Sequence, residues 1–364
     1  MKLYPLVLFL FNWMLSSCSD NEIPASETWP QASYGITDAT INTTGDFAIV
    51  AGFDEPAGWW DLKTNARLFN WSQSQDSADQ SSAPIQLTAI SPDSSRALTA
   101  NNKSFVIWNT QTGKSAGYYS SPTNIRDVAI SNGAQYVLLA LSDGRAYVVS
   151  MRSKRRLEFY GHQNHMIAQG IPKEYIGINS ADISANGRYA LTGGDDHFAI
   201  LWDTQTGQVV QQFPHPSRVT LVKFSADGSL AFTAGNNADA YIWKTTTGEK
   251  VATLQLKPRE YILSSAKFSP DNRWLSTGAP SRILSLWNTV DGSLIKTWRV
   301  KKRFKNKANG AVVLDTGFDG QYLISESSSG FGQKWQLPSA STSTNKETEA
   351  NTNSEQKPED SQTQ

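Results

Sequence analysis

The stretch SANGRYALTGGDDHFAILWDTQTG, residues 184–207, carries the pattern that decides the fold. It opens with the turn residues Ser184-Ala185-Asn186-Gly187, which are suited to joining two strands of a hairpin. An apolar strand then runs into Trp202, and a second turn follows as Thr204-Gln205-Thr206-Gly207. The glycine that ends this second turn can take the positive φ that the reversal needs. The stretch therefore predicts short antiparallel strands joined by tight turns.

The same pattern returns along the chain at a nearly constant phase. An apolar strand reaches a bulky residue at seven positions, which are Trp60, Trp108, Val149, Trp202, Trp243, Trp287 and Trp335. Their spacing is 41 to 53 residues, close to the blade period of four-stranded propeller repeats. The repeats predict a protein that builds its core blade by blade, and such a ring can stay a single domain at this length.

These repeats resemble the WD-repeat β-propeller family. Trp60-Asp61 and Trp202-Asp203 give the dipeptide that names the family, Trp108-Asn109 and Trp287-Asn288 are near matches, and Gly161-His162 supplies one Gly-His signature. The resemblance covers residues 28–337. It implies an all-β fold: a single closed propeller with seven blades of four antiparallel strands. Six or eight blades remain alternatives, because Val149 weakens one repeat.

The ring must also close. In the family, the last blade borrows its outer strand from the N-terminal part of the chain, and residues 28–34 stand before the first repeat. Pairing the two ends would remove two exposed sheet edges, which otherwise invite aggregation. We therefore expect the outer strand of the last blade to come from the N-terminal segment.

The N-terminal residues indicate export. Residues 3–15 are strongly apolar and are followed by Leu15-Ser16-Ser17-Cys18, which holds the single cysteine of the chain. The run is too short to span a bilayer as a helix and fits a secretory signal. The stretch resembles the bacterial lipobox, which implies that residues 1–18 are a lipoprotein signal peptide ending at an acylated Cys18. An ordinary signal peptide or an uncleaved anchor is the alternative.

A lipid anchor would place the protein in the bacterial envelope, on the periplasmic side, with the bilayer as one partner. Ser19 after the cysteine resembles the outer-membrane sorting signal, so the outer membrane is favoured if the host is Gram-negative. Residues 19–27 would then be a tether. Residues 338–364 are rich in Ser, Thr, Asn, Gln and Glu without an aromatic residue, a composition that predicts a disordered tail.

Composition and motifs argue against several function classes. Lys and Arg balance Asp and Glu at 33 each, and the pI is near 6.9, so no global field favours nucleic acid as a partner. The chain has four His, and it lacks a metal-motif Cys, a Gly-x-Ser-x-Gly elbow and a phosphate-cradling loop. We therefore expect neither a catalytic site nor a cofactor.

Three insertions carry the functional information. The extra residues lie at 71–84, 162–177 and 301–309, each between an outer strand and the next innermost strand. These connections are expected to open on one face, and insertions gathered on one face often mark a binding surface. The third insertion is basic and is the candidate binding loop, with Lys301, Lys302, Arg303, Phe304, Lys305 and Lys307. It could hold an anionic partner, or it could simply be a solvated loop.

A second basic run, Arg152 with Lys154, Arg155 and Arg156, is expected on the opposite face. The Gly-His loop admits two interpretations. The family resemblance implies that His162, Thr192, Asp196 and Trp202 form a hydrogen-bonded structural tetrad. The alternative is a metal site that adds His165, Asp195 and His197. Other blades are expected to lack the tetrad, with Asn237 and Ser281 at its Asp position.

Two function classes follow. The first is a membrane-anchored, non-catalytic scaffold that engages a protein or an anionic envelope polymer through the face of the inserted loops. The second is a propeller enzyme similar to quinoprotein oxidoreductases, because residues 287–292 and Trp298 resemble a repeat of that family, or a metal-binding propeller. The scaffold is the leading interpretation.

Overall fold

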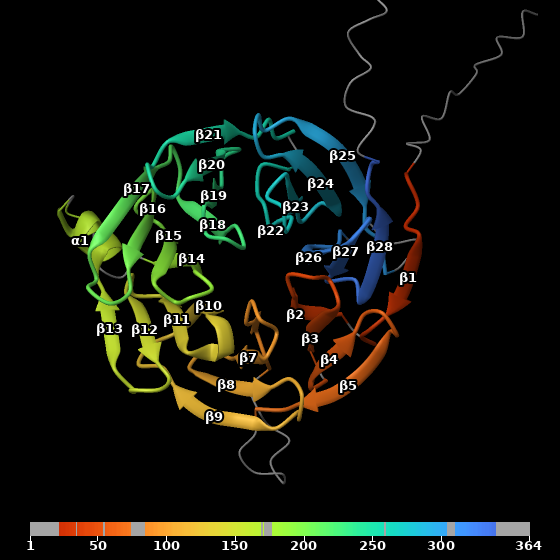
Figure 1. The fold of residues 1–364 in the computed structure, drawn as a ribbon, viewed down its shortest axis with the longest axis horizontal. Coiled ribbons are helices and arrows are strands. Elements are labelled where there is room, and N and C mark those ends of the chain that lie inside the picture. The colour runs from red at the N-terminus through yellow and green to blue at the C-terminus, as the bar shows by residue number, and fades with distance from the viewer. Residues whose placement is uncertain are drawn as a thin grey trace, which may run out of the picture.

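The structure is a computed structural model that describes residues 22–33, 35–53, 55–73, 84–168, 170, 177–257, 260–303 and 310–339. Figure 1 shows the described strands arranged as a ring around a central axis. They form seven sheets of four antiparallel strands each. The predicted all-β, seven-bladed propeller is therefore confirmed, and Val149 does not reduce the number of blades. Cys18 and the tail beyond Ser339 lie outside the described residues.

Each blade runs from an inner strand at the axis to an outer strand at the rim. Blades 1 to 3 comprise β2 (Ile36–Ile41), β3 (Phe47–Gly52), β4 (Ala57–Asp61) and β5 (Ala66–Trp71); β6 (Leu87–Ile90), β7 (Arg96–Ala100), β8 (Ser104–Asn109) and β9 (Ser115–Ser120); and β10 (Ile125–Ile130), β11 (Tyr136–Leu141), β12 (Ala146–Ser150) and β13 (Arg156–Phe159). Blades 4 and 5 comprise β14 (Ile178–Ile183), β15 (Tyr189–Gly194), β16 (Phe198–Asp203) and β17 (Val209–Pro214); and β18 (Val219–Phe224), β19 (Leu230–Gly235), β20 (Ala240–Lys244) and β21 (Lys250–Thr253). Blades 6 and 7 comprise β22 (Ser265–Phe268), β23 (Trp274–Gly278), β24 (Ile283–Asn288) and β25 (Leu294–Arg299); and β26 (Val313–Asp319), β27 (Tyr322–Ser327), β28 (Phe331–Gln336) and β1 (Glu27–Pro30).

The described residues also include the 3-10 helix η1 (Asn132–Ala134) and the helix α1 (Gly161–Ala168). No helix in the described part of the chain is long and apolar enough to cross a bilayer.

The predicted turns recur with the same hydrogen bonds. In blade 2, Ser91 Oγ donates to Asp93 Oδ1 at 2.6 Å and accepts from the Arg96 N–H at 3.0 Å. Ser225 and Ser269 make the equivalent bonds in blades 5 and 6. Short polar side chains that bind the backbone in this way stabilise a tight reversal, and Gly207 takes a φ of 74° in the second type of turn. The local sequence therefore sets the strand boundaries.

The seven bulky positions share one register, but the six tryptophans among them differ in environment. The Trp Nε1 donates to a hydroxyl two residues beyond its cross-strand partner in four blades, as Trp108 to Thr99, Trp243 to Thr233, Trp287 to Thr277 and Trp335 to Ser325, at 2.7 to 2.9 Å. Blades 1 and 3 carry Val50 and Leu139 at the hydroxyl position. A buried indole N–H needs a partner, so blade 1 cannot use the same arrangement, and blade 3 has Val149 in place of an indole.

Blade 1 buries a different tryptophan from the one that the repeat predicts. Trp60 has the expected register opposite Ala48 but is only partly buried, whereas Trp59 is 2% exposed. Trp59 stacks on Phe47 and Trp71 with ring centroids 5.3 and 5.6 Å apart. With Val50 in place of a hydroxyl, the blade packs the neighbouring indole into an aromatic stack instead.

The seventh blade takes its outer strand from the N-terminal segment. β1 pairs antiparallel with β28, and Trp29 lies opposite Gly332. Figure 1 shows β1, in red, beside the blue β28. Trp29 is 5% exposed and packs in a cluster with Ile36 and Ile324, so the strand brings apolar burial to the closure as well as backbone pairing.

Candidate functional site

The inserted loops open on one face of the ring. In an antiparallel four-stranded blade the second and fourth strands end on the same side, so the outer-to-inner connections share a face with the turns between the second and third strands. The connections β5 to β6, β13 to β14 and β25 to β26 contain the three insertions, and α1 lies in the second of them. We call this side the inserted face.

The first insertion begins later than the sequence suggests. Trp71 is the last residue of β5, is 2% exposed and stacks on Trp108 at 5.3 Å. It is therefore a core residue of the blade 1 to blade 2 boundary and not part of the loop. Residues 74–83 lie outside the described residues, as do 169 and 171–176 in the second insertion.

The candidate binding loop is described in part. Lys301 is exposed, Lys302 and Arg303 are half-buried, and Phe304, Lys305 and Lys307 lie outside the described residues. The Lys301 N–H donates to Gln333 Oε1 at 2.6 Å, and Arg303 Nη1 donates to the Ser329 carbonyl at 3.4 Å. The start of the loop is thus fastened to blade 7. The second basic run is exposed and extends from Arg152, in the turn between β12 and β13, to Arg156, the first residue of β13; this turn opens on the opposite face.

The Gly-His pair lies in the first turn of α1 and not in a loop, and it brings His162 to the residues that the family resemblance implies. His162 Nδ1 lies 2.8 Å from Asp196 Oδ1, and Nε2 lies 2.8 Å from Thr192 Oγ1, with both the His162 and Asp196 side chains fully buried. Trp202 departs from the expected arrangement: its Nε1 has no hydrogen-bonding partner in the described ranges, and its ring stacks on Phe159 at 4.5 Å. That this group stabilises blade 4 stays a prediction.

Blade 5 contains a complete hydrogen-bonded tetrad of the same kind, which was not predicted from the sequence. His215 Nδ1 lies 2.8 Å from Asp239 Oδ2 and its Nε2 lies 2.7 Å from Thr233 Oγ1, and Thr233 also accepts from Trp243. The expectation that Asn237 takes the Asp position was wrong, because the carboxylate comes from Asp239 two residues later. Burial disfavours the charged carboxylate, but hydrogen bonds from His215 and Ser217 lower the pKa of Asp239. His215 was the residue in the sequence that could have indicated this tetrad. It follows Pro214 and therefore lacks the Gly-His signature.

The described residues do not form a metal site around His162. Asp195 Oδ1 accepts from Asn179 Nδ2 at 2.8 Å and Asp195 Oδ2 lies 3.4 Å from Arg126. The side chain of His165 lies outside the described part of the chain. Among the residues that the structure describes, no group of three or more His, Cys, Asp or Glu side chains could hold a metal ion.

The hydrogen-bonded groups around His162 and His215 allow a matched test of how much each hydrogen bond stabilises the fold. Thr233→Val would orphan both His215 and the Trp243 N–H, whereas Thr192→Val would orphan only His162, since Trp202 makes no such bond. We expect each change to destabilise the fold by roughly 1 to 3 kcal/mol, with blade 5 losing about 1 kcal/mol more. Asp196→Ala and Asp239→Ala should cost a similar amount, and His197→Ala should be nearly silent. Urea unfolding measures the differences, and equal losses for the two threonines would contradict the hydrogen-bond assignment.

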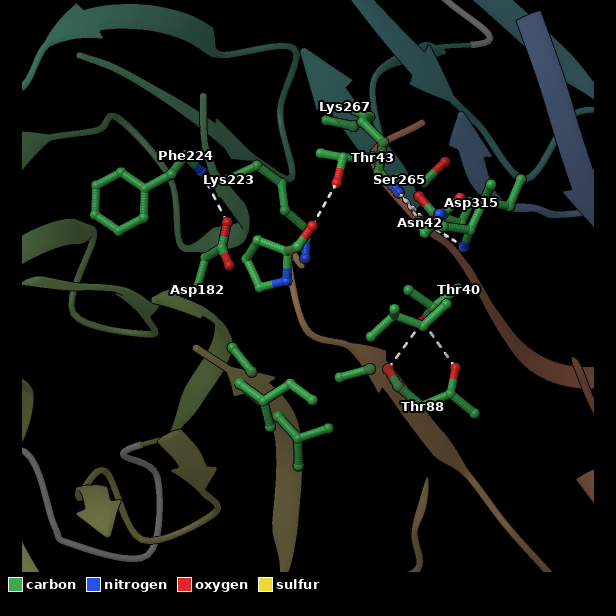
Figure 2. A pocket seen from close by; sticks show the side chains of 18 of the residues that line it. Thr40, Asn42, Thr43, Thr88, Asp182, Lys223, Phe224, Ser265, Lys267 and Asp315 are labelled. Carbon is green, nitrogen blue, oxygen red and sulfur yellow. Dashed lines mark hydrogen bonds and ion pairs between the residues drawn. The ribbon is translucent and has the colours of Figure 1, made fainter. Parts of the chain in front are cut away.

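The inner strands of all seven blades surround a cavity of about 260 Å³ on the axis of the ring. Its charged lining consists of Asp38, Asp127, Asp182, Asp315, Lys223 and Lys267. Figure 2 looks into this cavity, with Asp182 and Lys223 on one side and Lys267 and Asp315 on the other. These residues were not predicted from the sequence, although charged residues within otherwise apolar inner strands are a visible signal.

Carboxylates in the cavity tie blade 3 to blade 4, blade 4 to blade 5 and blade 7 to blade 1. Asp127 Oδ2 accepts from the Ala181 N–H and Asp182 Oδ2 from the Phe224 N–H, both at 2.8 Å. Asp315 Oδ2 accepts from the Ile41 N–H at 2.8 Å and from Lys267 Nζ at 2.7 Å. An inner strand is an edge of its sheet, and its outward N–H groups need partners. Blade-to-blade bonding therefore explains Asp127, Asp182 and Asp315 in the lining.

Burial shapes the charge of these groups. It raises the pKa of Asp38 to about 7, against the hydrogen bonds from Thr88 that lower it. It also raises the pKa of Asp182, although Lys223 partly opposes this. Burial alone would lower the pKa of Lys223, but the Asp182 carboxylate raises it above its ordinary value, so Lys223 stays a cation among the acids.

Comparison with known proteins agrees with this geometry. Residues 172–203 and 248–288 match the WD domain, G-beta repeat. The chain is also similar to eukaryotic translation initiation factor 3 subunit I of Scheffersomyces stipitis, with 29% identity over 183 residues, which cover 48% of this chain and 50% of that protein. The chain thus spans about half the length of this relative. Together with seven four-stranded blades, the two matching segments support a WD-repeat β-propeller.

Proposed function

We propose that the protein is a non-catalytic binding scaffold, held at a bacterial envelope membrane through an acylated Cys18, that engages a protein partner through the inserted face. A propeller with WD repeats supports the scaffold role, because such rings present large, rigid surfaces to other molecules. The relative is, by its name, a subunit of an initiation factor, which fits a role in assembly with other proteins. The anchor and the envelope location rest on the N-terminal sequence alone.

The observation that carries the proposal is a set of exposed apolar side chains on the inserted face. Phe53 is 63% exposed in the turn between β3 and β4, and Ile262 is 52% exposed in the connection between β21 and β22. Ile167 of α1 and Tyr261 are also more than 40% exposed. Exposed apolar groups on the face that carries the inserted loops support a partner-binding surface there.

Capture from cross-linked envelopes tests the binding face. Phe53→Ser and Ile262→Ser together should abolish recovery of a partner that the unchanged protein retains, since apolar anchors at an interface typically cost more than 1 kcal/mol each when truncated. Val290, which is 73% exposed in the turn between β24 and β25 on the opposite face, gives the control Val290→Ser. Loss of the partner with Val290→Ser but not with the double variant would place the interface on the other side.

The anchor makes a separate prediction. Cys18→Ala removes the only thiol of the chain, so lipidation could not occur. We expect the protein to leave the membrane fraction or to remain as an uncleaved precursor, because acyl chains provide the stable attachment. Fractionation and immunoblotting measure both outcomes, and unchanged processing with unchanged membrane association would overturn the lipoprotein proposal.

The quinoprotein-like alternative gains no support from Trp298. This side chain is 2% exposed and lies 6.2 Å from the ring of Trp335, within the core between blades 6 and 7. Packing accounts for the tryptophan without a cofactor. We therefore do not propose an oxidoreductase.

A further inference from the structure

The segment before β1 is fastened to the edge of the ring at blades 6 and 7. Glu22 Oε1 lies 3.6 Å from Arg282 Nη2 and 4.0 Å from Arg299 Nε. The Ser26 N–H donates to the Lys334 carbonyl at 2.8 Å, and Ala25 packs against the core of these blades. Figure 1 shows the red segment beside β28 and near the end of β25. From Glu22 onward the N-terminal segment therefore follows one defined edge.

The start of the candidate binding loop lies at the same edge. Lys301 donates its N–H to Gln333, and its Nζ lies 4.2 Å from the centroid of the Phe331 ring. Gln333 Nε2 in turn donates to Thr28 Oγ1 at 3.3 Å. The Gln333 side chain thus links the start of the basic loop to the N-terminal strand.

This edge carries an excess of positive charge. Its cations are Arg282, Arg299, Lys301, Lys302 and Arg303, and we call them the basic edge. Glu22 pairs with the first two. Within the described ranges, neither Lys301 nor Lys302 pairs with an acidic side chain. A cluster with this balance attracts anionic groups.

We propose that the basic edge rests on anionic phospholipid headgroups of the membrane that holds the protein. The inference builds on the proposed lipid anchor: Cys18 precedes Glu22 by four residues, which reach at most about 14 Å. Electrostatic attraction to a membrane surface decays over roughly 8 Å in physiological salt, and the short tether holds Glu22 within about two such lengths of the lipidated residue. The ring then stands with blades 6 and 7 toward the bilayer and blades 2 and 3 away from it.

The single cysteine allows a direct test that does not depend on acylation in cells. The full chain is coupled through Cys18 to a maleimide-bearing phospholipid in vesicles of phosphatidylcholine, with or without about 30% phosphatidylglycerol. Amine-reactive labelling and mass spectrometry then report the accessibility of Lys301 and Lys302. Lys154, exposed in the second basic run, is the internal control.

We expect labelling of Lys301 and Lys302 to slow by about fivefold or more on the anionic vesicles, and the protection to vanish near 0.5 M salt. A variant with Lys301, Lys302 and Arg303 changed to Gln should also lose protection at Lys296 of β25, while the same change of Arg152, Lys154 and Arg155 should keep it. Equal rates on both vesicles, or equal protection of Lys154, would overturn the inference. Cys18→Ala fractionation reports on the natural anchor separately, so the two failures are distinguishable.

Discussion

Deleting residues 28–34 is expected to destabilise the propeller by roughly 5 kcal/mol or more, the largest effect of any change considered for this fold. The deletion removes the backbone pairing of β1 with β28 and the burial of Trp29. Loss of a buried tryptophan alone costs about 3 to 5 kcal/mol, and the ladder bonds add to it. The free edge of β28 should also promote association between molecules.

Two controls separate closure from general damage. Removal of residues 340–364 should change the unfolding free energy by less than about 1 kcal/mol, because that composition buries little surface. Placing residues 22–34 after Ser339 instead of before Gly35 should restore most of the stability, since β1 and β28 can still pair. Urea unfolding and size-exclusion chromatography measure the outcomes. Comparable losses for the two truncations would show that closure by the N-terminal strand contributes little.

The second large effect is expected at Glu326 of β27. Its position in the blade is occupied by Ala or Gly in the other six blades, as Ala51, Ala100, Ala140, Gly193, Ala234 and Gly278. Glu326 is 0% exposed, and its oxygens have no hydrogen bond of good geometry among the described residues, although the Gln31 amide partly offsets the burial. Burial raises the pKa of Glu326 from 4.5 to about 8.

The sign of the pH dependence follows from this shift. In the unfolded chain Glu326 loses its proton near pH 4.5, whereas the folded protein keeps it until about pH 8. The unfolded state therefore binds fewer protons than the folded state within that window. The contribution of Glu326 to the free energy of unfolding falls as the pH rises from about 4.5 to about 8. Asp38 adds a similar slope between 3.8 and about 7.

Glu326→Gln should remove the first slope. We expect the free energy of unfolding to differ little from that of the unchanged protein near pH 4. Near pH 9 we expect it to be higher by on the order of 3 kcal/mol, because the unchanged protein must then bury an ionised Glu326. Glu27→Gln, at an exposed residue of β1 in the same blade, is the control. Unfolding free energies across this range test it, and a difference that is independent of pH would mean that Glu326 does not titrate as a buried acid.

Much of the fold could be predicted because its signals are local. The Ser-x-Asp turns, the glycines of the second turns and the spacing of the bulky residues act within a few residues of the chain, and the structure places strands and turns where they indicate. The candidate site was harder to predict. Trp71 was predicted to lie in a loop but is buried in the core, because it stacks on Trp108 of the next blade. Asn237 was predicted at the position of the acid, but Asp239 takes that role because it is hydrogen-bonded to His215.

The sequence by itself determined the period, the turns and hence the seven-bladed ring, because hydrophobic pattern and turn chemistry need no distant partner. Only the tertiary structure decided which tryptophan blade 1 buries and which acid is hydrogen-bonded to His215. It also decided which blades the carboxylates of the central cavity connect. Asp315 bonds to Ile41 across 274 residues of sequence, a contact that exists only once the ring has closed. Hydrogen-bond partners of this kind come from distant parts of the sequence, so the repeat pattern cannot predict them.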